Sequence, residues 1–590
     1  GINAEYGEMG CGININSDLD SKEMLVSEMR QETQTTEQNF PQNQTIAQIQ
    51  SEQSSPPQQI EQQNTKQIVH PIQPHIKTVI IIGCTHAGTL AAIALRSLDK
   101  ECRIIIFEKN SVISFLSCGI HLAVNKTCTD QSKMFYNSPQ TLRKMGIEVY
   151  SDSHVCNLDF ANNFVNSEVH TGKLQLKYDK LIISSGSSPI VPPIIQNINY
   201  LGDVTAQMRT MKRILLAKNY NDSLKLAKLY KPKRVCIIGA GLIGMELAWA
   251  FSDIGSHVTV VDHGERMLSK YFDQEYTDVL TELCQNLSIE MVCNARVCKM
   301  TESLTDVIMV AEQKVGSQIK NIQLTFDYVI LCAGFRPNTK FAMDPKLNTL
   351  KEVIITDKLC HTSIADVYAI GDCASTYSHM LNSNTYIPLA THAIRHGLVA
   401  AYDVAGVQLP FSGTNGSCAV QLFNYSLAAT GMSQVDAQKQ FENVNRVIYS
   451  DFLYHRYCNK KLERVVQKES LNAKFDKYGD IVRGLADAVI DSFECLDAET
   501  QEDQIVSVSI CYQTETGQVF GAQAMGKQDI TQAANAISAA ISLDVSLDEI
   551  AQMDFGGQCG EEKPWNVMAV AAASRDLEIV DFEGEEKENQ

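Results

Sequence analysis

The sequence has no long unbroken hydrophobic run, no excess of basic residues and no closely spaced cysteine pair. The most apolar stretch, residues 78–95 (TVIIIGCTHAGTLAAIAL), contains glycines and a histidine, so we interpret it as a strand, a turn and a helix rather than a membrane span. The net charge of -19 argues against nucleic acid or an anionic membrane as the main partner. The 18 cysteines are scattered without CxxC spacing, which favours a reducing compartment, and we expect a cytoplasmic protein.

The chain of 590 residues is too long for one hydrophobic core. Its first 75 residues are rich in Gln, Ser and Pro and almost without aromatic residues, which predicts a disordered tail, with a partner-binding tail as the alternative. Apolar strands that end in glycine and lead into helical segments predict parallel α/β sheets covered on both faces. An alternating pattern at 504–513 and a helical one at 530–543 predict a separate α+β domain towards the C-terminus.

A glycine-rich turn at residues 239–244 carries the clearest ligand-binding pattern. Gly239, Gly241 and Gly244 follow an apolar strand and open a helical segment, a spacing that allows a tight turn, approach of a pyrophosphate and close helix packing. The next apolar run ends in Asp262, where a carboxylate can accept hydrogen bonds from a ribose 2′-hydroxyl. The pattern predicts a dinucleotide site that favours NADH over NADPH; a turn without ligand is the alternative.

A related turn lies between Gly83 and Gly88, with Thr85 in place of the middle glycine. Glu108 ends the following strand, so a second dinucleotide site is predicted. Two such sites indicate two cofactors, and a nicotinamide and a flavin are the pair between which a hydride can pass. Asp372 ends a further strand and could accept a hydrogen bond from a flavin ribityl chain, although an ordinary capping aspartate is the alternative.

Cys118, in the segment SFLSCG, has no second cysteine at a spacing of five residues, because Ile113 and Ala123 occupy those positions. An internal disulfide is therefore not encoded locally, and a sulfenic acid or a mixed disulfide is the chemistry that remains open. The segment is expected to be a loop entering a helix, which predicts a thiol with a lowered pKa. A structural thiol is the alternative.

Seven motifs in order carry a resemblance to a known family. They are VIIIGCTHAGT, FLSCG, YDKLIISSGSSP, GAGLIGMELA, VILCAGFRPNT, TSIADVYAIGDCA and YIPLATHA. In this order they resemble the pyridine nucleotide-disulfide oxidoreductases over residues 76–580, and within these the single-cysteine branch of NADH oxidases, NADH peroxidases and coenzyme A-disulfide reductases. The resemblance implies an α/β fold with two Rossmann-like domains, one for FAD and one for NAD, and a C-terminal α+β domain that forms a homodimer.

The resemblance also implies site residues. Those implied for FAD are Gly83, Thr85, His86, Ala87, Gly88, Glu108, Lys109, Cys118, Val155, Ser185, Gly186, Asp372, Ala390 and Thr391. Those implied for NADH are Gly239, Gly241, Gly244, Asp262, Tyr271 and Gly334. Cys118 is implied as the redox centre, and His86 beside it as the active-site base, whereas an isolated histidine would more often be a core residue. No metal site is expected.

The same comparison divides the chain into domains. The predicted parts are a tail at 1–75, a FAD-binding domain at 76–193 and 319–405, an NAD-binding domain at 194–318, a dimerisation domain at 406–580 with an insertion near 456–503, and an acidic tail at 581–590.

Within the branch, SFLSCGI and GCTHAGT look most like the water-forming NADH oxidases, and Leu90 stands where peroxidases tend to carry glutamate. The implied activity is reduction of O2 to water by NADH through FAD and a cysteine that cycles between thiolate and sulfenic acid. The alternatives are a coenzyme A-disulfide or persulfide reductase, an NADH peroxidase, or a flavoprotein redox sensor without turnover. Two departures from the family are Leu242, where a tyrosine is usual, and the segment FGGQCG at 555–560.

Overall fold

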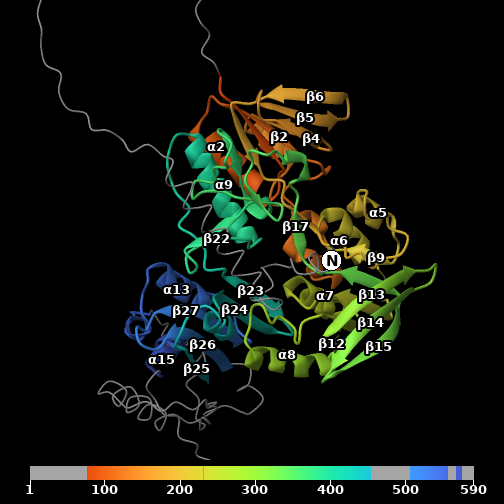
Figure 1. Ribbon diagram of the computed structural model, residues 1–590, viewed down its shortest axis with the longest axis vertical. Coiled ribbons are helices and arrows are strands. Elements are labelled where there is room, and N and C mark those ends of the chain that lie inside the picture. Colours follow the sequence, from red (N-terminus) through yellow and green to blue (C-terminus); the bar gives the residue numbers. More distant parts are fainter. Residues whose placement is uncertain (1–75, 230–231, 453–504, 556–565, 575–590) are drawn as a thin grey trace, which may run out of the picture.

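The computed structural model describes residues 76–229, 232–452, 505–555 and 566–574. These form two α/β domains and a C-terminal α+β domain, which confirms the predicted fold class (Figure 1). The expected tail at 1–75, the insertion near 456–503, the acidic tail at 581–590 and most of the segment FGGQCG lie outside the described residues. Within the described ranges, no helix combines the length and the apolar character that crossing a membrane requires.

The first α/β domain is built on a five-stranded parallel sheet. In spatial order its strands are β20 (Val367–Ala369), β7 (Lys180–Ile183), β1 (Thr78–Ile82), β2 (Arg103–Phe107) and β3 (Ile147–Tyr150). Successive side chains of the central strand β1 point to opposite faces of the sheet, and both faces are covered. Val79 and Ile81 pack in the cluster with helices α2 (His86–Leu98) and α9 (Ala390–Val404), whereas Ile80 and Ile82 pack in the cluster beneath the three-stranded sheet.

That three-stranded antiparallel sheet consists of β4 (His154–Asp159), β5 (Phe164–Val169) and β6 (Gly172–Lys177). On the opposite face, α2 and α9 approach closely enough that a Cβ at Gly397 would lie 2.5 Å from the carbonyl oxygen of Ala87. The second helix of this pair and strand β20 come from far along the chain, so the first domain is made of two separate segments.

The second α/β domain repeats the layout of the first. Its parallel sheet contains, in order, β12 (Ile289–Val292), β11 (His257–Val261), β10 (Arg234–Ile238), β16 (Tyr328–Leu331) and β9 (Ile214–Leu216). A three-stranded antiparallel sheet precedes β16 in the chain, as β4–β6 precede β7. Its strands are β13 (Ala295–Glu302), β14 (Val307–Val315) and β15 (Gln318–Phe326). Helix α7 (Leu242–Asp253) follows β10 as α2 follows β1, so the two glycine turns occupy equivalent positions.

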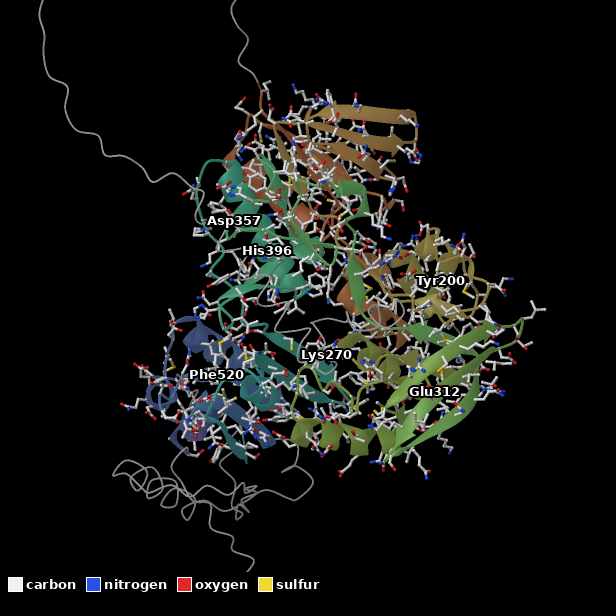
Figure 2. The ribbon with its side chains drawn as sticks, viewed as in Figure 1. Tyr200, Lys270, Glu312, Asp357, His396 and Phe520 are labelled. Carbon is white, nitrogen blue, oxygen red and sulfur yellow. The ribbon has the colours of Figure 1, made fainter. Side chains whose placement is uncertain are left out.

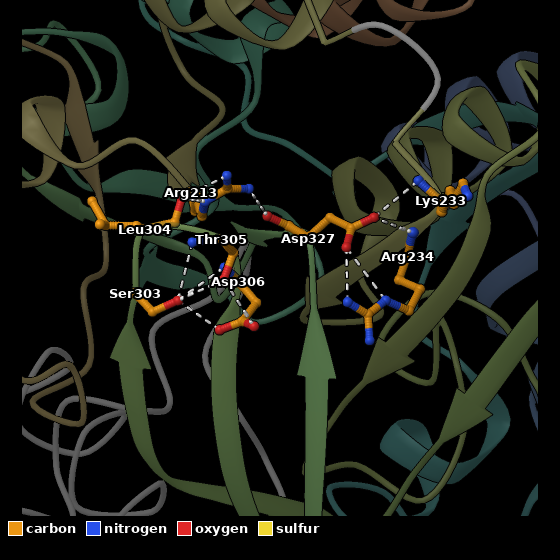
Figure 3. A network of polar contacts seen from close by, with 8 residues as sticks. All are labelled: Arg213, Lys233, Arg234, Ser303, Leu304, Thr305, Asp306 and Asp327. Atoms are coloured by element: carbon orange, nitrogen blue, oxygen red, sulfur yellow. Dashed lines mark hydrogen bonds and ion pairs between the residues drawn. The ribbon is translucent and has the colours of Figure 1, made fainter.

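A polar network fixes the amino ends of three strands of the second domain (Figure 3). The Asp327 carboxylate accepts hydrogen bonds from the Arg234 side chain at 2.9 Å and from the backbone N–H of Arg234 at 3.0 Å. Arg213 donates to the carbonyl oxygens of Asp327 at 3.0 Å and Leu304 at 2.8 Å. These contacts lie at the end of the sheet opposite the glycine turn, so the carboxyl ends of the strands remain for a ligand.

The C-terminal domain contains a five-stranded antiparallel sheet with helices α13 (Thr531–Ser542) and α15 (Val567–Ala573) packed on it. Its strands, in order, are β23 (Cys418–Leu422), β24 (Tyr425–Gly431), β27 (Val519–Gly526), β26 (Ile505–Gln513) and β25 (Val444–Phe452). The strand and helix predicted at 504–513 and 530–543 are confirmed as β26 and α13. The domain is joined to the second one through Gln523, whose side chain donates to Asp273 at 2.9 Å just before helix α8 (Gln274–Asn286).

A histidine links α9 to the segment that leads into β20. The His361 ring lies between the carboxylates of Asp357 at 2.9 Å and Asp403 at 2.7 Å, and Tyr368 also donates to Asp403. Figure 2 shows Asp357 on the same side of the first domain as His396 of α9. Hydrogen bonding to Asp357 is the largest of the effects that raise the pKa of His361, so the protonated form of this side chain is favoured.

We expect this link to make stability depend on pH. Because the folded pKa is raised, the contribution is fully present below the unfolded value of about 6.5 and is lost as the pH rises through the folded value. At pH 6 the His361→Gln variant should be less stable than the wild type by up to about 1 kcal/mol, since the pair is partly exposed. Unfolding midpoints of both proteins at pH 6 and pH 9 test this expectation. The same difference between variant and wild type at the two pH values would contradict it. His170→Gln, at an exposed histidine, is the control.

Candidate functional site

The two glycine turns have the geometry that dinucleotide sites require. Gly83 and Gly239 have φ values of 97° and 110°, which side chains rarely tolerate. A Cβ at Gly88 would lie 2.0 Å from the Gly83 carbonyl oxygen, and one at Gly244 would lie 1.9 Å from that of Gly239. A Cβ at Gly241 would meet no atom within 4 Å, so the backbone there is open to a pyrophosphate.

Each turn is tied to the acidic residue that follows the next strand. The Glu108 carboxylate accepts the N–H of Cys84 at 2.8 Å, and the Asp262 carboxylate accepts the N–H of Ala240 at 2.6 Å. A carboxylate has about four lone-pair sites, so each side chain retains acceptors for ribose hydroxyls. No side-chain cap occupies the first turn of α2 or α7, where Thr85 and Gly241 are the N-cap residues. The residues present therefore fit two dinucleotides.

Asp372 stands at the carboxyl end of β20, as the sequence predicts. Its carboxylate accepts hydrogen bonds from Ser187 at 2.7 Å and from Lys218 at 3.3 Å. Burial raises its pKa, but Lys218 and Ser187 outweigh that effect, so the pKa lies below its ordinary value and the group is ionised at neutral pH. Lys218 also lies 4.1 Å from the centre of the Phe335 ring. An ionised acceptor at this strand end suits a ribityl hydroxyl.

Some of the other residues predicted for FAD lie near the same end of the sheet. A Cβ at Gly371, next to Asp372, would lie 3.1 Å from that of Ala87. Ala390 and Thr391 begin α9, whose later residue Ala393 also borders Gly371. The carbonyl oxygen of Gly186 accepts the N–H of Asn338, and the Ser185 hydroxyl donates to the carbonyl oxygen of Asn338. Val155 is buried in β4, and Lys109 is exposed directly after β2.

The residues predicted for NADH beyond the turn lie on the second domain. Tyr271 is half-buried against the cluster that contains residues of α7. Gly334 follows β16 with a φ of 99°, and its carbonyl oxygen accepts the N–H of Ile190 at 2.9 Å.

His86, the first residue of α2, is paired with Tyr136. The Tyr136 hydroxyl lies 3.0 Å from Nδ1 of His86, and the two rings stack with centroids 5.4 Å apart. Burial lowers the pKa of His86 more than the nearby Asp372 raises it. The imidazole is therefore neutral at pH 7 and can accept a proton.

Cys118 lies in the short 3-10 turn Ser117–Gly119, directly before helix α3 (Ile120–Val124). Its side chain is exposed, and it is a free thiol. The expected lowering of its pKa is wrong: desolvation by the surrounding protein raises the pKa, and the carboxyl of Glu246 raises it further. The physical reason is that α3 has five residues and a weak dipole, while a buried acid lies close to the sulfur.

The thiol lies between the two nucleotide-binding halves of the molecule. The segment before Cys118 pairs with the segment that carries Tyr136, the partner of His86, because Leu116 N–H donates to the carbonyl oxygen of Met134 at 2.8 Å and Tyr136 N–H donates to that of Ser114 at 3.2 Å. On its other side, α3 packs against α7, the helix that the second turn opens. Cys118 therefore lies between the segment that pairs with His86 and the helix that follows the second glycine turn.

Comparison with known proteins agrees with this arrangement. Residues 77–397 match the family described as pyridine nucleotide-disulphide oxidoreductase. The chain belongs to this family. The fold, the family and the class of enzyme that the sequence motifs imply are confirmed, and the oxidoreductase therefore depends on FAD.

The chain is similar to NADH oxidases and to a persulfide reductase. The NADH oxidase of Enterococcus faecalis is 30% identical over 499 residues, which cover 84% of the chain and 98% of that protein. A NAD(P)H coenzyme A polysulfide/persulfide reductase of Pyrococcus horikoshii is 30% identical over 366 residues, 62% of the chain and 78% of that protein. The solved structure of the water-forming NADH oxidase from Lactobacillus brevis bound to NADH has a TM-score of 0.69 at 29% identity and covers 84% of the chain and 98% of its own.

Three residues of this site were not predicted from the sequence, namely Lys218, Tyr136 and Glu246. Lys218 and Tyr136 carry no local signal, because their partners lie far along the chain. Glu246 has one: it stands alone among apolar residues in LIGMELAWAF, where an acid on a buried helix is unusual.

Proposed function

We propose that this oxidoreductase is an NADH oxidase that reduces O2 to water through FAD, with Cys118 cycling between thiolate and sulfenic acid. The observation that carries the proposal is the position of Cys118 between the His86–Tyr136 pair and helix α7. The named NADH oxidases at about 30% identity and the water-forming structure support the reaction.

Under this proposal, Glu108 and Asp372 hold the ribose and ribityl hydroxyls of FAD, and the first turn of α2 faces its pyrophosphate. Asp262 binds the ribose of NADH and disfavours a 2′-phosphate. Bound FAD supplies two-electron transfer between NADH and the acceptor. The neutral imidazole of His86, held by Tyr136, accepts and returns protons during oxygen reduction.

The stoichiometry of the reaction tests this function. Two NADH and one O2 should disappear together with two protons, giving two NAD⁺ and two water molecules, and no hydrogen peroxide should accumulate. Parallel measurements with a NADH absorbance assay, an oxygen electrode and a peroxide assay distinguish the outcomes. One NADH per O2 with stoichiometric peroxide would contradict the water-forming reaction.

A second candidate is reduction of a coenzyme A disulfide or persulfide, because the persulfide reductase of P. horikoshii is similar over 366 residues. Here Cys118 would form a mixed disulfide with the substrate thiol. NADH consumption with coenzyme A disulfide under nitrogen, compared with O2 alone, separates the two reactions. Consumption with hydrogen peroxide instead would identify an NADH peroxidase, and a yellow protein that oxidises NADH with none of these acceptors would be a redox sensor.

A further inference from the structure

A histidine and a glutamate form a pair on the side of Cys118 that faces the second domain. His121 lies on α3, one turn after Cys118, and Glu246 lies on α7. Nδ1 of His121 is 3.7 Å from Oε2 of Glu246, and the two side chains are only 15% and 17% exposed. His121 also has a hydrogen bond to the backbone of Cys118. The imidazole therefore lies between the glutamate and the residue that carries the thiol, and its Nδ1 is buried without a hydrogen-bond partner.

The buried location determines where the protons reside. Burial raises the pKa of Glu246 to about 8, so at neutral pH this side chain is mostly protonated. Burial lowers the pKa of His121, which is neutral and can pass a proton from one ring nitrogen to the other. Ionised Glu246 would also raise the pKa of Cys118, so a carboxylate and a thiolate oppose each other here. A thiolate at Cys118 therefore favours the protonated form of Glu246.

The charged groups on the elements that pack against α3 and α7 have other partners or lie farther away than His121 and Glu246. Helix α6 (Tyr220–Ala227), which also packs on α3, carries Asp222 and Lys225. Asp222 accepts the N–H groups of residues at the start of that helix, and Lys225 donates to the carbonyl oxygen of Arg209. Asp253 is at the far end of α7, two turns from Glu246. The thiol of Cys332 is neutral, because burial and the charge of Glu246 raise its pKa to about 12.

We propose that Glu246, through His121, stores a proton beside Cys118 and donates it when the sulfenic acid of that residue is reduced. The S–O bond breaks, the oxygen leaves as water with the proton from Glu246, and the sulfur becomes a thiolate. The two electrons come from NADH, so that NADH and Cys–SOH give NAD⁺, Cys–S⁻ and water. The proton released from NADH restores Glu246. This role rests on the proposed function, and it places a second proton site opposite His86.

Two measurements on the full-length holoenzyme test the role of Glu246. The first is the pH profile of Cys118 alkylation by iodoacetamide, quantified by mass spectrometry of its peptide without NADH. In Glu246→Gln the midpoint should move to lower pH, because the carboxylate charge is removed. The second is the decay of sulfenic acid, formed with one equivalent of hydrogen peroxide and trapped with dimedone at intervals after NADH is added. This decay should slow by about 100-fold in Glu246→Gln.

The controls separate proton storage from structure. Asp253→Asn replaces a carboxyl by an amide on the same helix and should leave both measurements at their wild-type values. His121→Gln keeps a hydrogen-bonding side chain but cannot relay a proton, so it should slow the decay of the sulfenic acid while leaving the alkylation midpoint in place. If Glu246→Gln does not fold, the decay rate in His121→Gln tests the proton relay instead.

A wild-type decay rate in Glu246→Gln would overturn the proposal, and so would an unmoved alkylation midpoint. If no sulfenic acid can be trapped in the wild type, the proposed function fails and the proton has no recipient. In that case the alkylation profile still shows whether Glu246 controls the ionisation of the thiol, so the two failures are distinguishable.

Discussion

A Cys118→Ser protein is expected to consume one NADH per O2 and to release hydrogen peroxide, in place of two NADH per O2 and water. The serine hydroxyl cannot be oxidised to the equivalent of a sulfenic acid, so the second two-electron reduction has no site. We expect peroxide to account for nearly all of the oxygen consumed, a change of at least about 10-fold from the wild type. An oxygen electrode combined with a peroxide assay measures it.

The control for this substitution is Cys156→Ser, because Cys156 is also an exposed free thiol but lies in β4. It should leave the stoichiometry unchanged. A Cys118→Ser protein that still forms water without free peroxide would show that the sulfur is not required. Flavin content should be equal in both variants, since neither substitution changes the glycine turns that shape the flavin site.

Gly88→Ala is expected to yield a protein that does not retain flavin. The added Cβ would lie 2.0 Å from the carbonyl oxygen of Gly83 and 2.5 Å from Oγ of Ser184, so the turn must open to admit it. Such overpacking costs about 3 kcal/mol or more, and the contact is with backbone that cannot rotate away. The ratio of flavin to protein absorbance after purification measures the loss, together with the thermal unfolding midpoint.

Gly241→Ala is a matched comparison, because a Cβ there meets no atom within 4 Å. This variant should fold with a full complement of flavin, while its affinity for NADH should fall because the methyl group stands where the pyrophosphate approaches. Normal flavin retention by Gly88→Ala would contradict the assignment of the first turn.

The nucleotide-binding parts of the fold could be predicted from the sequence because their signals are local. Gly239 and Asp262 belong to one strand–turn–helix–strand unit, and the backbone geometry of that unit demands glycine at fixed positions. The environment of Cys118 could not be predicted in the same way. Its pKa depends first on burial by the folded protein and then on Glu246, which is brought near by packing of α3 on α7 across the boundary between two domains.

The same limit explains why a local argument about Cys118 was wrong. A cysteine before a helix is expected to ionise more readily, but that expectation holds for a helix with several turns and no opposing charge. Tertiary packing reverses the direction, mainly because it buries the thiol and secondly because it brings the carboxyl of Glu246 near. Tyr136 beside His86 is a similar case, because the two residues are 50 positions apart and their pairing depends on the fold.

The division of the first α/β domain into two segments has a consequence for synthesis of the chain. Strand β7 pairs with β20, yet roughly 180 residues separate them, which a ribosome takes roughly 10 to 40 s to translate. The second α/β domain lies entirely within that interval and can fold first. Until β20 emerges, the apolar strand β7 is an open sheet edge, the kind of surface that pairs with other chains. We therefore expect the nascent chain to be most prone to aggregate after its second α/β domain is complete and before its first is closed.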